Sequence, residues 1–128
     1  MFLASTFAGF AFSNTKTAIA HNISYAVTLE KGIAHGIACS FTLPHILNSF
    51  NDECCKASVH LKEVFGQDLA SASSNLNKWI NDLGIKTHPS EYGYSKEEWE
   101  SLVNNAVSGE RGKNFSGNSM ALLSSVNW

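Results

Sequence analysis

The chain has 128 residues, of which 44% are hydrophobic and 16% are charged, and its formal net charge is −2. A chain of this length is expected to form one domain, residues 1–128, that buries roughly two-thirds of its unfolded surface. The near-neutral charge argues against a nucleic-acid partner. Its three cysteines are too few for a disulfide scaffold, so we expect a reducing, cytoplasmic setting.

Charged residues are distributed unevenly along the chain. Residues 1–51 contain Lys16, Glu30 and Lys31, and all the other charged residues follow Asn51. The first part of the chain is therefore expected to be buried. It is not expected to cross or enter a membrane, because the uncharged run after Lys31 carries several polar side chains and the apolar N-terminus lacks the positive region of a signal peptide.

Apolar residues recur with helical spacing, which predicts an all-α helical bundle. Residues 2–12 resemble a helix fragment that has no capping residue before it, as though its natural start were missing. Asn14 or Thr15 is expected to cap a second helix that runs to about Leu29.

The second helix has two distinct faces. Ile19, Ile23 and Val27 form an apolar face, whereas His21 and Tyr25 lie four residues apart on another face, with Ser24 beside them. Two faces that both suit burial predict a central position for this helix.

The remaining elements follow in order. Gly32 is expected to end the second helix, and a third helix is expected from His35 to about Ser49, bent at Pro44. Two amphipathic helices follow Asn51. Gly66 and Gly84 are expected to end them, and the second carries an apolar stripe formed by Leu69, Leu76, Trp79, Ile80 and Leu83. Ser95 and Glu98 have capping-box spacing at the start of a further helix, and a polar loop then leads to a short C-terminal helix.

His21 and His35 are the candidate metal ligands. They are separated by 14 residues, a connection that spans the end of one helix, a glycine and the start of the next. This connection can fold back and bring the two imidazoles together, and the N-terminus of a helix helps to keep His35 uncharged. The alternative is that both are polar residues satisfied within a packed helical core, and the spacing alone favours this alternative. His45 is interpreted as structural, and His60 and His88 as weaker candidates.

Two other classes of active site are disfavoured. Ser24 has no histidine and carboxylate within reach to form a nucleophilic relay. The sequence also lacks a glycine pattern that would bind phosphate.

The stretch "ASTFAGFAFSNTKTAIAHNISYAVTLEKGIAHGIACSFTLPHIL" resembles the C-terminal helical domain of the iron-containing alcohol dehydrogenases. In that family an "AS…AG…F" helix precedes a histidine, and fourteen residues later a "PHG" turn opens a helix that ends in "LPxxL". The resemblance covers residues 4–47 closely, and the later helices with "ERGKNFSGN" more loosely.

The resemblance implies a metal site and a redox reaction. His21 and His35 would hold a divalent metal, Fe(II) or Zn, together with an aspartate and a third histidine from an earlier helix. The metal would act as a Lewis acid on a small alcohol or aldehyde while hydride moves to or from NAD(P). Tyr25 would face the reaction site as the candidate catalytic residue.

This sequence departs from the family pattern in three respects. Tyr25 stands where many members have a second histidine, and Ala34 stands where proline usually precedes the second ligand. The nucleotide-binding domain and the other two ligands are not in the sequence. The segments "NTKTAIAHNISY" and "RGKNFSG" are similar to a branch that acts on phosphonoacetaldehyde-like substrates.

These observations lead to two hypotheses. The first is that the chain is the C-terminal portion of a metal-dependent, NAD(P)-linked alcohol dehydrogenase or aldehyde reductase, inactive by itself. The second is that it is a non-catalytic helical module that self-associates into a homo-oligomer through uncovered apolar faces.

Overall fold

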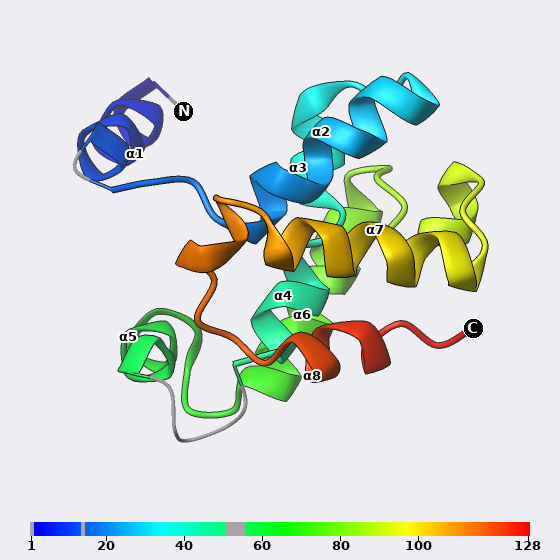
Figure 1. Ribbon diagram of the computed structural model, residues 1–128. Coiled ribbons are helices and arrows are strands. Elements are labelled where there is room, and N and C mark those ends of the chain that lie inside the picture. The colour runs from blue at the N-terminus through cyan, green and yellow to red at the C-terminus, as the bar shows by residue number, and fades with distance from the viewer. Residues whose placement is uncertain (1, 14, 51–55) are drawn as a thin grey trace.

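The computed structural model describes residues 2–13, 15–50 and 56–128, and all regular elements in these ranges are helical. The predicted all-α bundle is therefore confirmed (Figure 1). The elements are α1 (Phe2–Ser13), α2 (Ile19–Lys31), α3 (His35–Ser40), α4 (Leu43–Asn48), α5 (Lys56–Phe65), α6 (Leu69–Asp82), the 3₁₀ helix η1 (Pro89–Tyr92), α7 (Lys96–Ser108), the 3₁₀ helix η2 (Gly112–Asn114) and α8 (Ser119–Ser124). Among the described residues, no helix combines the length and the apolar composition needed to cross a membrane.

Helix α2 lies at the centre of the main core, as the sequence predicts. It packs against α3 and against α7. The predicted apolar face is buried: Ile23 and Val27 are fully inaccessible, and they belong to the same cluster as Trp99 and Val103 of α7. Burying each aliphatic side chain of this kind stabilises the fold by roughly 1.5–3 kcal/mol.

The predicted start of α2 is wrong. The helix begins at Ile19, its N-cap residue is Ala18, and no side chain caps it. Thr15 instead bonds to the preceding helix: its hydroxyl donates to the carbonyl of Ala11 in α1 at 3.3 Å. The other predicted cap, Asn14, lies outside the described residues.

The helix predicted from His35 to about Ser49, with a bend at Pro44, is divided into two short helices. Helix α3 ends at Ser40 and α4 begins at Leu43, with Phe41 and Thr42 buried between them. Proline has no N–H to donate to the preceding turn, so it is tolerated in the first turn of a new helix. Helix α4 then packs against α6 and α8.

Several predicted helix ends are confirmed. Gly66 and Gly84 follow α5 and α6 with φ values of 94° and 83°, a left-handed conformation that favours glycine. At the start of α7, Ser95 and Glu98 form both bonds of the capping box.

The predicted apolar stripe of α6 is only partly buried. Leu69 and Ile80 are buried, whereas Trp79 and Leu83 are each 59% exposed. Helix α6 packs on α4 and α5, and these two contacts cover a narrower face than the sequence pattern suggests.

Helix α1 does not join the core. It has no buried residue, and Phe2, Leu3, Phe7 and Phe12 are between 55% and 83% exposed. Figure 1 shows it apart from the bundle, joined to α2 by an extended segment. The expectation that the low-charge first part of the chain is buried is therefore right for the apolar face of α2 and wrong for α1.

His45 of α4 links two distant segments. Its Nε2 donates to the carbonyl of Thr87 at 2.9 Å, and its Nδ1 lies 3.0 Å from the hydroxyl of Ser125. Burial lowers the pKa of His45, although the bond to Thr87 opposes this shift. The neutral ring is thus the form that the fold favours.

We expect the fold to lose stability when the pH falls below the ordinary histidine pKa of about 6.5. Unfolded His45 takes up a proton more readily than folded His45, so the free energy of unfolding should decrease until both states are protonated. Urea unfolding on either side of this pH measures the loss. The loss should be smaller in His45→Gln, in which the other histidines are unchanged, and an equal loss in both proteins would contradict the prediction.

Candidate metal centre

A tight reversal at Gly32 brings the two predicted ligands together. Gly32 ends α2 with φ 67° and ψ 18°, and its N–H donates to the carbonyl of Thr28. This left-handed conformation costs little for glycine alone. Helix α3 begins three residues later, at His35, and packs back against α2.

The imidazoles of His21 and His35 face each other across this reversal. Their ring centroids are 5.3 Å apart, and the rings meet edge to face. His21 is half-buried and His35 is exposed. The sequence-based expectation that the connection folds back is therefore confirmed, and it is this proximity that makes a shared cation feasible.

A third donor, Cys39, completes the cluster. One ligand atom from each of His21, His35 and Cys39 can be chosen so that all three lie within 4.8 Å of one another. The cysteines entered the sequence-based expectations only through the redox setting, so the place of Cys39 in this cluster was not predicted. The available signal was its position four residues after His35, which places both side chains on one face of α3.

The Ser24 hydroxyl favours one tautomer of His35. The Ser24 side chain is fully buried, and its hydroxyl donates to the carbonyl of His21 at 2.8 Å. Because that single hydrogen is used, the oxygen can only accept from Nδ1–H of His35, which lies 3.4 Å away. The Nε2 lone pair of His35 therefore points elsewhere, and Cys39 Sγ lies 3.6 Å from it.

His21 is kept in the form that can bind a cation. Burial lowers its pKa, and the neighbouring charges of His35 and Arg111 lower it further. A neutral imidazole offers a free nitrogen lone pair, as metal coordination requires.

Tyr25 lies beside the cluster, as the sequence predicts from its position one turn after His21. Its ring stacks on His35 with centroids 5.7 Å apart, and the Arg111 guanidinium lies 4.7 Å above it. The side chain is 41% exposed.

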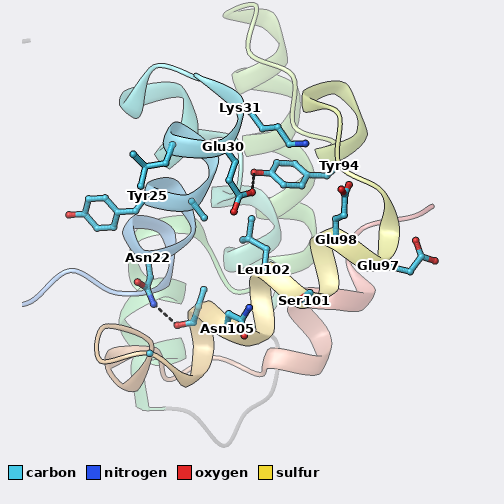
Figure 2. A pocket seen from close by; sticks show the side chains of 14 residues that line it. Asn22, Tyr25, Glu30, Lys31, Tyr94, Glu97, Glu98, Ser101, Leu102 and Asn105 are labelled. Carbon is cyan, nitrogen blue, oxygen red and sulfur yellow. Dashed lines mark hydrogen bonds between the residues drawn. The ribbon is translucent and has the colours of Figure 1, made fainter.

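A cavity of about 960 Å³ lies between α2 and α7, on the other side of Tyr25 (Figure 2). Tyr25 lines this cavity. His21, His35 and Cys39 are not among the described residues that line it. Across the cavity the Tyr94 hydroxyl donates to Glu30 at 3.1 Å, and burial followed by the Glu30 charge raises the pKa of Tyr94. At the lower end Asn22 donates to the carbonyl of Ala106 at 2.6 Å, a bond that ties α2 to α7.

The other histidines lie away from the cluster. His60 is exposed on α5, 3.5 Å from Glu63. His88 bonds the carbonyl of Asn127 through Nε2 and meets the Trp128 ring edge to face. Neither belongs to the group of donors that the described part of the chain assembles.

Comparison with known proteins gives a family and several distant relatives. Residues 1–120 match the C-terminal region of the Fe-containing alcohol dehydrogenase family. The NADP-dependent alcohol dehydrogenase 3 of Entamoeba histolytica is 30% identical over 88 residues, which cover 66% of this chain and 23% of the relative. The sulfoacetaldehyde reductase of Bilophila wadsworthia is 28% identical over 122 residues, which cover 87% of this chain and 32% of the relative.

A third relative is the human mitochondrial hydroxyacid-oxoacid transhydrogenase, which is 25% identical over 133 aligned positions, covering 87% of this chain and 28% of the relative. The chain thus spans about a third or less of the length of these curated relatives. No solved structure matches it significantly. The family match over residues 1–120 nevertheless decides the assignment, and the chain belongs to the Fe-containing alcohol dehydrogenase family, whose C-terminal region it represents.

Proposed function

We propose that this chain contributes half of the metal site of an NAD(P)-linked alcohol dehydrogenase or aldehyde reductase. In this proposal His21 and His35 are metal ligands, and Tyr25 is the catalytic residue that borders the substrate. The observation that carries it is the convergence of two imidazoles, 14 residues apart in sequence, to a centroid distance of 5.3 Å.

The donor set suits the metals that the family resemblance implies. Imidazole nitrogen is a good ligand for both iron and zinc, and the tautomer that Ser24 favours leaves a lone pair on Nε2 of His35. When bound, a divalent metal supplies Lewis-acid polarisation of the substrate oxygen, and the nicotinamide accepts or gives the hydride.

The chain's own residues have distinct roles in this proposal. His21 and His35 hold the cation, and Ser24 is a positioning residue that orients His35. Tyr25 stacks on His35 and is one of the residues that line the adjoining cavity, and in this proposal it borders the substrate.

The substrate that we propose carries an anionic group. A second cavity, of about 570 Å³, is lined by Lys16, Arg111 and Lys113 and by Glu110, which pairs with Lys113 at 2.6 Å. Arg111 also lies over Tyr25. The net positive charge of this lining would attract a phosphonate or sulfonate. This supports the phosphonoacetaldehyde-like branch, and one of the relatives is named as a sulfoacetaldehyde reductase.

We expect the 128-residue chain to bind Zn(II) through the histidine pair. His21→Ala and His35→Ala should each abolish most of the binding, because each removes a ligand. Ser24→Ala should weaken it by roughly 10–100-fold, as loss of an outer-shell partner does in other metal sites. Isothermal titration calorimetry measures the three affinities.

The matched control for Ser24 is Ser73→Ala. Ser73 is half-buried and likewise donates to a backbone carbonyl, that of Pro44, far from the cluster. Equal Zn(II) affinities for Ser24→Ala and Ser73→Ala would show that Ser24 has no positioning role. Unchanged binding in His21→Ala would overturn the proposed site.

We propose that these 128 residues alone do not oxidise alcohols. The family resemblance implies two further ligands and a nucleotide-binding domain that this sequence does not contain. Incubation with NADP⁺ and a panel of alcohols, including phosphonate- and sulfonate-bearing ones, should give no NADPH above the level of His21→Ala. Metal-dependent turnover that disappears in His21→Ala would refute the proposal.

A second candidate function is self-association through α1. The exposed Phe2, Leu3, Phe7 and Phe12 form an apolar surface on a helix that has no buried residue. Another copy of the chain could cover such a surface, because apolar faces of this kind associate in water.

This candidate predicts a concentration-dependent dimer. Sedimentation equilibrium at micromolar concentrations should show association that Phe7→Glu weakens. Val64→Glu, at a site on α5 that is 76% exposed, serves as the control and should leave the association unchanged. A monomer at every concentration would exclude this function.

A further inference from the structure

We infer that Cys39 is a third metal ligand, so that this chain by itself holds a cation in a His₂Cys site. The inference rests on the proposed histidine pair and goes beyond it, because it adds a sulfur donor. Three protein ligands with one open position is the arrangement of catalytic zinc sites.

The spacing within α3 fits a shared tetrahedral cation. Zn–S distances of about 2.3 Å and Zn–N distances of about 2.0–2.1 Å place two tetrahedral ligand atoms about 3.5 Å apart. Cys39 Sγ lies 3.6 Å from His35 Nε2. These two donors, one helical turn apart, are therefore already at the separation that coordination needs.

His21 closes the site from the neighbouring helix. All three donor atoms lie within 4.8 Å of one another. Coordination would require the side chains to move closer together, and His21 and Cys39 are only half-buried.

The hydrogen bonds of His35 direct its Nε2 atom toward Cys39. The Ser24 hydroxyl accepts from Nδ1–H of His35, so Nε2 presents a lone pair, and that lone pair accepts from the Cys39 thiol. A cation would replace the thiol proton, which is released to solvent on binding. The same hydrogen-bonded pair would then become a pair of ligands.

The sulfur donor also bears on which metal is bound. Thiolate is a soft ligand that favours zinc, whereas carboxylate and water favour harder cations. Two imidazoles and a thiolate thus form a set that zinc and cobalt occupy readily. Co(II) is the useful probe, because a cobalt–thiolate bond gives a charge-transfer absorption that cobalt–imidazole bonds lack.

The experiment uses the 128-residue chain with Cys54→Ser and Cys55→Ser, which leaves Cys39 as the one thiol. Co(II) is titrated under a phosphine reductant, and Zn(II) affinity is measured by competition. We expect the charge-transfer band in this background protein. Cys39→Ser should abolish the band and weaken Zn(II) binding by more than the ~10–100-fold typical of an outer-shell change.

Two further variants make the outcome decisive. Ser40→Ala changes the next residue, whose hydroxyl donates to the carbonyl of Gly36, and should leave band and affinity unchanged. In His21→Ala the intensity of the charge-transfer band and the Zn(II) affinity should both fall. Binding that is lost in His21→Ala but unchanged in Cys39→Ser would overturn the thiol ligand while sparing the proposed function, and binding unchanged in His21→Ala would overturn both. Circular dichroism verifies that each variant keeps its helical content.

Discussion

The reversal at Gly32 is the constraint on which the candidate site depends. It turns the chain within a few residues, so that the first turn of α3 lies against the middle of α2. Only a residue without Cβ adopts its φ of 67° at low cost. A side chain at this position would strain the turn that holds His21 and His35 together.

Helix α2 performs two tasks on two faces. Its apolar face is buried against α7, which fixes the helix in the bundle. Its other face presents His21 and Tyr25 toward α3, with Ser24 buried between them. Because the core anchors the helix, the backbone under the donors is held rigidly while the donor side chains remain accessible. This is the arrangement expected of a preorganised binding site.

Tyr25 contacts both the donor cluster and the larger cavity. It stacks on His35 on one side, lines the larger cavity on another and lies under Arg111. The family resemblance places a histidine at this position in many members. A phenol hydroxyl can both donate and accept a hydrogen bond.

Local patterns of the sequence predicted the helical class and the ends of several helices, because helical period, capping residues and glycines act locally. For His21 and His35 the 14-residue spacing left a packed-core role open, and the family resemblance made them candidate ligands. Tertiary structure alone decided which apolar faces are covered. Trp79 and Leu83 continue a predicted stripe but stay exposed, since burial depends on which neighbours pack there and not on the helix itself. It likewise decided that Cys39 and Ser24 join the histidines, because a donor cluster is a property of how two helices meet in space.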